Sequence, residues 1–374
     1  MIDLRRKGIA TSIPVSIVGR VSKADSDFVV VSSQENELEQ GFGGKVVLTT
    51  KSLSNFPQPL VHSVKSLEGI TVGDVIQILP SGVLHVLFRA GSLDNSLFTT
   101  DQCNSNCLMC SQPPKKVDDI EYHFELNCSI IRLMPATTEI VGITGGEPTL
   151  LGQKLFEMFR MLTEMHPHCL VHILTNGRAF AYQSFVKQYL SVSTENHIWG
   201  IPIYSDFYSD HDYIVQAKGA FNETIQGIYN LARIGARIEL RIVVHKLTVL
   251  RLKQLTKFIS KNLTFVERVA FMGLEYIGYT PFNDQLLWID PLDFQEELHD
   301  AVVLLDDLGI NVSIYNLPLC LLPKEVRRFA IKSISDWKRE YLTMCTGCAL
   351  KTDCGGVFGT SKKLSENIQA IRIE

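Results

Sequence analysis

Apolar residues along the chain predict a regular alternation of strands and helices from Ser96 onward. Six runs have the length and the β-branched or aromatic content of buried strands. Helix-length segments with apolar residues spaced near 3.6 lie between them, for example residues 150–165 and 249–263. Strands that alternate with helices pair in parallel through right-handed crossovers, and six units are too few to close an eight-stranded barrel. We therefore expect an α/β fold with an open, partial (β/α)6 barrel of the TIM type. The six runs are residues 96–100, 139–144, 169–175, 198–204, 237–244 and 268–273.

The segments on either side of this pattern differ from it. Residues 1–95 contain short β-rich runs separated by polar or glycine-bearing turns, which predicts a mostly-β domain. That domain carries no chemical motif, and we expect it to pack against the rest or to dock a partner or peptide. Residues 96–315 contain the partial barrel, and residues 316–374 form a cysteine-rich extension.

Charge and hydropathy exclude several classes of protein. Lys and Arg number 36 and Asp and Glu 40, so the formal net charge is −4 and a general nucleic-acid or anionic-membrane coat has no electrostatic support. No apolar run approaches the roughly 18 residues of a transmembrane helix, and no apolar core of a signal peptide follows the basic start. We expect a cytoplasmic protein. Its nine cysteines lie mostly in two clusters, which in a reducing compartment favours metal or redox chemistry.

The first cluster follows the first predicted strand and has the spacing C-x3-C-x2-C: Cys103, Cys107 and Cys110. Three thiolates can hold three corners of an iron–sulfur cube, whereas most such clusters have four cysteine ligands. The remaining iron would then be open to a small molecule, which distinguishes a catalytic cluster from an electron carrier. Zinc is the alternative, but structural zinc usually takes four protein ligands, and no nearby His or Cys completes the set.

The second predicted strand ends in Gly145-Gly146-Glu147-Pro148. Glycines allow close approach of the backbone to a ligand, Glu147 offers a carboxylate to an ammonium group, and Pro148 can open the next helix. By itself this sequence is equally consistent with an ordinary tight turn. Its position at the strand end after the cysteine loop makes it a candidate part of the same site.

The two motifs together resemble those of the radical S-adenosylmethionine (SAM) enzymes. In that family the three cysteines hold a [4Fe–4S] cluster whose fourth iron binds the amino and carboxylate groups of SAM. The resemblance implies that Cys103, Cys107 and Cys110 are cluster ligands and that the Gly145–Pro148 turn recognises the methionine end of SAM. It also implies the reaction: an electron from the cluster cleaves the sulfur–C5′ bond, and the 5′-deoxyadenosyl radical takes hydrogen from a substrate. The family often has an aromatic residue near the adenine where this chain has Met109.

Weaker matches extend the predicted SAM site. Asn176 and Ser205 lie at the ends of the third and fourth predicted strands, where the family commonly contacts SAM, and Arg241 lies on the fifth predicted strand, from which it could reach polar groups of SAM. For each, a turn or a hydrogen-bonded strand-end group is the alternative interpretation. His211 and His245 are interpreted as structural, and no residue is assigned as a catalytic acid or base.

The second cysteine cluster lies in the tail, which resembles the SPASM/twitch extensions of peptide-modifying radical SAM enzymes. Only four cysteines follow the barrel, and Phe358 stands where the two-cluster pattern would continue with a cysteine. The tail therefore predicts one auxiliary [4Fe–4S] cluster, with a structural zinc site or incidental cysteines as alternatives. Its ligands would be Cys320, Cys345, Cys348 and Cys354.

A closer resemblance is to the HxsC maturases of His-Xaa-Ser systems, carried by CNSNCLMCSQPP, ITGGEPTL and CTGCALKTDCGGVFGTS. It implies a ribosomally made precursor peptide as substrate, a partner radical SAM maturase, and an electron donor such as flavodoxin or ferredoxin. Two alternatives remain open. One is radical SAM chemistry on a small molecule or nucleoside, and the other is a non-catalytic iron–sulfur electron-transfer or scaffold protein.

Overall fold

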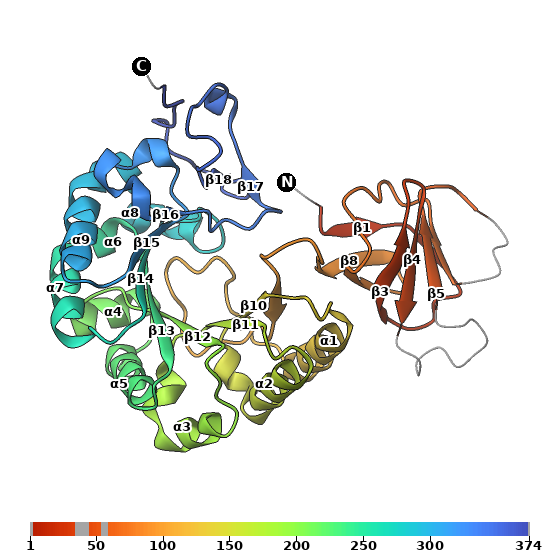
Figure 1. The fold of residues 1–374 in the computed structure, drawn as a ribbon, viewed down its shortest axis with the longest axis horizontal. Coiled ribbons are helices and arrows are strands. Elements are labelled where there is room, and N and C mark those ends of the chain that lie inside the picture. The colour runs from red at the N-terminus through yellow and green to blue at the C-terminus, as the bar shows by residue number, and fades with distance from the viewer. Residues whose placement is uncertain (1–2, 34–44, 54–58, 373–374) are drawn as a thin grey trace.

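A computed structural model describes residues 3–33, 45–53 and 59–372 of the chain. Its strands form one N-terminal sheet, one large parallel sheet and a small C-terminal pair (Figure 1). The N-terminal sheet has the order β1-β8-β7-β3-β4-β5-β6-β2. Its strands are β1 (Arg5–Lys7), β2 (Ile9–Thr11), β3 (Ile17–Ala24), β4 (Phe28–Ser33), β5 (Lys45–Thr49), β6 (Leu60–His62), β7 (Val75–Ile78) and β8 (Val83–Phe88).

The N-terminal sheet closes on itself at Gly8. β1 pairs with β8 and β2 pairs with β6, and only Gly8 separates β1 from β2, so one bent segment joins both edges. The Gly8 amide donates to the Gly82 carbonyl at 2.9 Å. Gly82 has a positive φ of 79°, and a side chain there would collide with the Gly8 carbonyl. Closure in this way covers strand edges that would otherwise invite pairing with other chains.

The large sheet is parallel throughout, in the order β16-β15-β14-β13-β12-β11-β10-β9. All six predicted strands are present, and the prediction of an α/β fold with an open, partial barrel is confirmed. The sheet continues with two short strands that the periodicity did not count as barrel strands. The strands are β9 (Ser96–Phe98), β10 (Ile140–Thr144), β11 (Leu170–Leu174), β12 (His197–Pro202), β13 (Arg237–Val244), β14 (Arg268–Gly273), β15 (Val312–Tyr315) and β16 (Ala330–Ile331).

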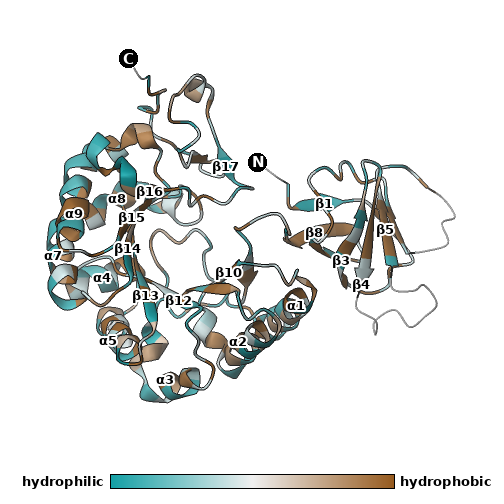
Figure 2. Cartoon of the chain, viewed as in Figure 1, coloured by the Kyte–Doolittle hydropathy of each residue, from teal (hydrophilic) through white to brown (hydrophobic). Residues whose placement is uncertain are grey.

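Helices cover the outer face of the parallel sheet and turn their apolar sides toward it (Figure 2). Gly235, with φ 73°, follows the last turn of α5 in the left-handed conformation that commonly ends a helix. The α-helices are α1 (Ile120–Leu133), α2 (Gln153–Met165), α3 (Gln183–Leu190), α4 (Tyr208–Val215), α5 (Ala220–Arg233), α6 (Lys246–Val249), α7 (Leu252–Asn262), α8 (Asp284–Leu287) and α9 (Gln295–Asp307). The 3₁₀ helices are η1 (Pro148–Leu151), η2 (Arg178–Ala181), η3 (Thr280–Asn283), η4 (Pro291–Phe294), η5 (Leu319–Leu321), η6 (Lys324–Phe329) and η7 (Thr343–Cys345).

The three parts of the chain are joined by side-chain contacts. In the N-terminal sheet, Gln77 donates to Tyr122 of α1 at 3.0 Å. The C-terminal segment contains β17 (Arg339–Glu340) and β18 (Val357–Phe358), which pair antiparallel. Just before β17, the Asp336 carboxylate accepts two hydrogen bonds of 2.7 Å from Arg89, which follows β8. This ion pair ties the C-terminal segment to the linker that precedes the parallel sheet.

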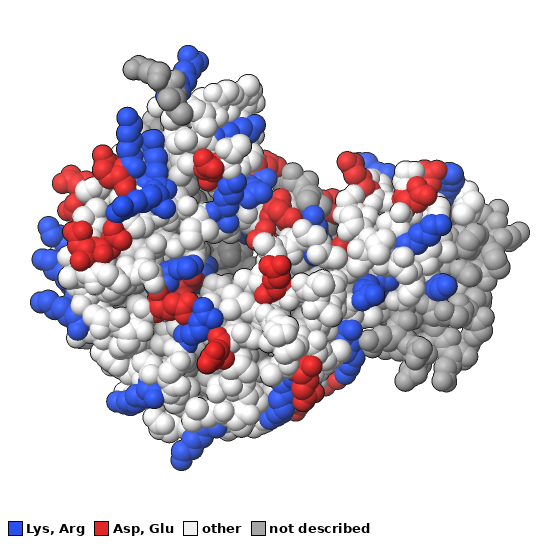
Figure 3. All heavy atoms as spheres, in the orientation of Figure 1, with Lys and Arg blue, Asp and Glu red and all other residues white. Residues whose placement is uncertain are grey.

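Surface charge of both signs is interspersed on the face shown in Figure 3. Among the helices that the structure describes, none is long and apolar enough to cross a membrane.

Substitution of Gly82 by Ala tests the closure of the N-terminal sheet. The methyl group would meet the Gly8 carbonyl and force Ala into the left-handed region, so we expect a loss of about 1–3 kcal/mol in the free energy of unfolding. Urea unfolding of the full chain measures this. Gly91→Ala is the matched control, because no atom lies within 4 Å of its added methyl group. Equal stabilities of the two variants would contradict the closure.

Candidate functional site

The cysteine loop lies at the carboxyl edge of the parallel sheet, directly after β9. Its second half is fixed by backbone hydrogen bonds to the end of α4: Asn106 N donates to Val215 O at 3.0 Å and Leu108 N to Ile214 O at 2.9 Å. Cys110 O accepts from Tyr279 N at 2.9 Å. These contacts hold an irregular segment in place, and they leave Cys103, Cys107 and Cys110 half-buried.

The three thiols share one electrostatic environment. Burial, followed by the charge of Glu147, raises the pKa of Cys103 to about 11. Burial, followed by Cys110 and Cys103, raises the pKa of Cys107 to about 12. Without a positive centre the thiols therefore stay protonated, and a bound metal cluster would supply the charge that stabilises three thiolates.

This donor set fits a cluster held at three corners, since each cysteine of a cubane binds its own iron. Among the residues that the structure describes, no three His, Cys, Asp or Glu side chains are arranged around a position for one metal ion.

The Gly145–Pro148 turn packs against the start of the cysteine loop. Gly146 N donates to Thr100 O at 2.6 Å, and Glu147 N donates to Gln102 O at 2.8 Å. A Cβ on Gly146 would collide with the Gln102 carbonyl, and one on Gly145 would lie 2.8 Å from Thr100 O. The glycines therefore allow close approach, but the group that approaches is the backbone of the chain itself.

Glu147 is 1% exposed and joins two strand ends. Its Oε1 accepts from the Thr149 hydroxyl and the Thr175 hydroxyl, each at 2.6 Å, and from Thr149 N at 3.0 Å. Its Oε2 accepts from Asn176 N at 2.7 Å. A carboxylate offers about four acceptor positions, two on each oxygen, so Oε1 is fully used, whereas Oε2 has one donor among the described residues and can accept from another. Its predicted role in binding an ammonium group stays a prediction.

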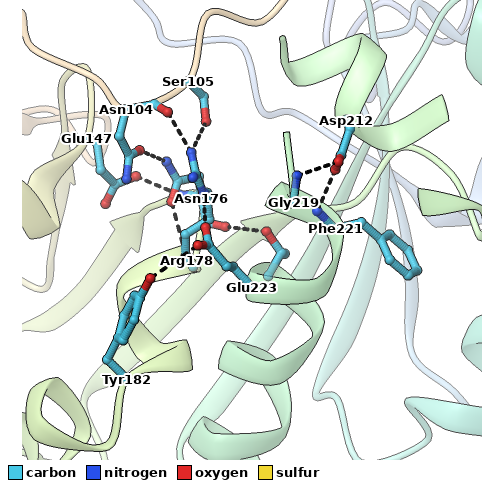
Figure 4. Close-up of polar contacts among 12 residues, drawn as sticks. Asn104, Ser105, Glu147, Asn176, Arg178, Tyr182, Asp212, Gly219, Phe221 and Glu223 are labelled. Carbon is cyan, nitrogen blue, oxygen red and sulfur yellow. Dashed lines mark hydrogen bonds and ion pairs between the residues drawn. The ribbon is translucent and has the colours of Figure 1, made fainter. Parts of the chain in front are cut away.

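The structure places the weaker predicted SAM contacts in three different settings. Asn176 reaches the cysteine loop, where its Nδ2 donates to Asn104 Oδ1 at 2.6 Å (Figure 4). Ser205 is buried, and its hydroxyl accepts from Phe207 N within a local turn at 3.1 Å. Arg241 lies on β13, pairs with Glu239 at 2.6 Å and lines a cavity. Only Asn176 thus contacts the cysteine loop directly.

Other predicted positions have local roles. Pro148 begins η1, and Met109 is 7% exposed in an apolar cluster with Tyr204. His245 is fully buried and caps α6 by accepting from Thr248 N. His211 Nδ1 accepts from Tyr204 N at 3.3 Å.

A cavity of about 590 Å³ lies inside the partial barrel, and most of the residues that line it belong to none of the sequence motifs. Five strands contribute polar side chains to it, Ser111 and Gln112 follow the cysteine loop into it, and the C-terminal segment lines another side. Each of these strands contributes a single polar side chain, so no repeated polar pattern along one strand marks the cavity in the sequence. The polar lining includes Ser96, Thr144, His172, Arg241, Tyr315, Trp337, Lys338 and Thr360.

A buried charge network forms one wall of this cavity. Glu239 accepts from Arg241 at 2.6 Å and from the Tyr315 hydroxyl at 2.9 Å, and His172 Nε2 lies 3.4 Å from its Oε1. Burial alone would raise the pKa of Glu239, but His172, Arg241 and Tyr315 together lower it to about 2. Gly200 leaves room for the network, since its Cβ would lie 3.0 Å from both Arg241 and His172.

The four C-terminal cysteines meet around one small apolar cavity. Backbone amides point at their sulfurs: Leu319 N and Gly356 N donate to Cys354 Sγ, and Ile371 N donates to Cys348 Sγ, each at 3.4 Å. Burial raises the pKa of Cys320, and the charges of Cys354 and Cys345 add to the effect. Four converging thiols with N–H donors fit the ligand set of an iron–sulfur cluster. The cavity is lined by Cys320, Cys345, Cys348 and Cys354.

Comparisons with known proteins give structural likenesses of low identity. No protein-family model and no curated protein sequence matches the chain. SuiB of Streptococcus suis, solved with its precursor peptide SuiA, is 12% identical with a TM-score of 0.46, over 61% of this chain and 49% of that one. The enzyme anSMEcpe with bound AdoMet is 18% identical with a TM-score of 0.46, over 59% and 62%. HemN of Escherichia coli, a radical SAM enzyme, is 10% identical with a TM-score of 0.46, over 57% and 52%. The matched part is thus half to three fifths of those chains, and similarity at this level assigns no activity.

The charge network predicts a specific pH dependence of stability. The folded-state pKa of Glu239 lies below the ordinary value of 4.5, so its contribution is complete above that value and is lost as the pH falls toward about 2. We expect Glu239→Gln to remove roughly 3 kcal/mol at neutral pH, with the difference from wild type shrinking on acidification. Urea unfolding at several pH values measures this difference. A difference that is independent of pH would show that the carboxylate is not held ionised.

Proposed function

We propose that this chain is a radical SAM enzyme. The observation that carries the proposal is the docking of the C-x3-C-x2-C loop on the Gly-Gly-Glu-Pro turn at the carboxyl edge of a partial barrel. In such folds ligands bind at the carboxyl ends of the strands. The amides of Gly146 and Glu147 hold the start of the loop, so the two motifs act as one unit.

Cys103, Cys107 and Cys110 would hold the [4Fe–4S] cluster, which when bound supplies the electron that cleaves SAM. The chain's own residues provide the surroundings. Met109 of the loop packs with Tyr204 in an apolar cluster, which would exclude water from that side of the site. Burial of Glu147 within the turn fixes the relative positions of β10, β11 and the loop.

The substrate would occupy the cavity that runs from Ser111 and Gln112 to the C-terminal segment. Its hydroxyl, amide and charged groups suit a polar peptide segment, and the proposed substrate is a ribosomally made precursor peptide of the His-Xaa-Ser type. The N-terminal domain (1–95) would then dock that peptide or a partner maturase, and a flavodoxin or ferredoxin would supply electrons. A volume of about 590 Å³ also lies in the usual range for small-molecule sites. That observation favours, as the second candidate, the same chemistry on a small molecule or nucleoside.

The C-terminal segment (316–374) would bind one auxiliary [4Fe–4S] cluster through its four cysteines. The convergence of these thiols and the three N–H···S contacts support this proposal, since hydrogen bonds to sulfur tune cluster potentials. Phe358 and Thr360, on the same segment, line the barrel cavity. The segment would therefore serve both the auxiliary cluster and the substrate.

Replacement of Cys107 by Ala tests the catalytic cluster. After anaerobic reconstitution, wild type should form 5′-deoxyadenosine from SAM and dithionite, and Cys107→Ala should form none while losing about four irons per chain. Cys128→Ala is the matched control, because Cys128 is a buried thiol of α1 that is 3% exposed. A wild-type cluster whose EPR spectrum does not respond to SAM would instead indicate a non-catalytic electron carrier.

Replacement of Cys348 by Ala separates the two proposed clusters. We expect the variant to lose about four irons per chain and to keep the SAM-dependent EPR change and 5′-deoxyadenosine formation. Iron analysis and the cleavage assay on one reconstituted sample measure both. Full iron content in Cys348→Ala would contradict the auxiliary cluster, and one zinc per wild-type chain would identify the structural alternative.

A further inference from the structure

The two halves of the cysteine loop are held by different kinds of contact. Backbone hydrogen bonds to α4 and to the segment around Tyr279 hold residues 106–110. The first half, Cys103 to Ser105, is held by side chains that come from the turn after β11. Asn176 Nδ2 donates to Asn104 Oδ1, and Arg178 Nη1 donates to Asn104 O at 2.5 Å and to Ser105 Oγ at 3.2 Å. This half is therefore the part that a single side-chain change can release.

Arg178 occupies the centre of this arrangement (Figure 4). It is the first residue of η2, its side chain is 14% exposed, and its guanidinium bridges the loop to α5. On the α5 side, Nε donates to Glu223 Oε2 at 2.6 Å. Glu223 Oε1 in turn accepts from the Tyr182 hydroxyl at 3.2 Å. The guanidinium thus donates hydrogen bonds from Nε toward α5 and from Nη1 toward the cysteine loop, and these bonds fix its orientation.

The cysteine loop is an irregular segment, and ordering it for cluster binding costs conformational entropy. Ordering each residue of an irregular segment costs about 1–2 kcal/mol of backbone entropy. Contacts that exist before the cluster binds offset part of this cost. Lys cannot replace Arg178 in them, because its single ammonium lacks the flat fork of Arg.

We propose that Arg178 is a positioning residue that holds Cys103–Ser105 in the cluster-binding conformation, with Glu223 orienting its guanidinium. The inference rests on the proposed function for the identity of the bound group. The ordering of the loop by Arg178 is a property of the cluster-free chain and is measurable there.

The test compares Arg178→Gln and Arg178→Lys with Arg237→Gln. Arg237 pairs with Glu267 at the same 2.6 Å between Nε and Oε2, but at the start of β13, the opposite end of the strands from the cysteine loop. In the cluster-free protein, amide hydrogen exchange of residues 103–105 should become faster in both Arg178 variants and stay unchanged in Arg237→Gln. After reconstitution, the Arg178 variants should hold their cluster about tenfold more weakly against an iron chelator. The EPR spectrum of the retained cluster should also shift.

Each outcome has a defined meaning. Unchanged exchange in Arg178→Gln would overturn the inference even if the wild type binds its cluster. Faster exchange throughout the chain in Arg178→Gln would indicate general destabilisation, and the milder variant Glu223→Gln then decides. It should make exchange faster at residues 103–105 alone, and either unchanged exchange there or faster exchange throughout the chain would overturn the inference. A wild-type chain that binds no iron while its Arg178 variants show faster local exchange would refute the proposed function and leave Arg178 as an anchor of the loop alone.

Discussion

The contact between two backbone segments at the carboxyl edge of the sheet is the constraint on which the site depends. The amides of Gly146 and Glu147 bind the carbonyls of Thr100 and Gln102, and this requires that Gly146 have no side chain. Because the β9–α1 loop and the β10–η1 turn meet in this way, the residues directly before Cys103 are held in a defined position. Arg178, Asn176 and the end of α4 complete the support of the loop.

Burial of charge is managed differently in the two regions of the barrel. Beside the cysteine loop, Glu147 accepts hydrogen bonds from hydroxyl groups and backbone amides. In the cavity, Arg241, Tyr315 and His172 together lower the pKa of Glu239, and these three side chains also line the cavity. The hydrogen bonds of Glu147 suit a rigid support for the cysteine loop. The side chains around Glu239 suit a surface that binds a polar substrate in the cavity.

The motif residues could be predicted from the sequence, and several of their neighbours could not. Cysteine spacing and the Gly-Gly-Glu-Pro turn identified the loop and the strand end that meet, and the cysteines of the tail do converge. The hydrogen bonds that Glu147 accepts could not be predicted, because one of its donors lies 29 positions away in the sequence. Arg178, Glu239 and Gly200 carry no recognisable motif, and their importance depends on which strands lie beside one another.

The sequence by itself determined the type and order of the elements, since apolar periodicity and turn residues act over a few positions. It also determined the thiol sets, since ligand spacing is a local property. The tertiary structure alone decided that β15 and β16 extend the sheet, that the cavity is closed partly by the C-terminal segment, and that Arg178 reaches Asn104, 74 positions away. Such contacts depend on crossovers that bring distant segments together, and no local pattern records them.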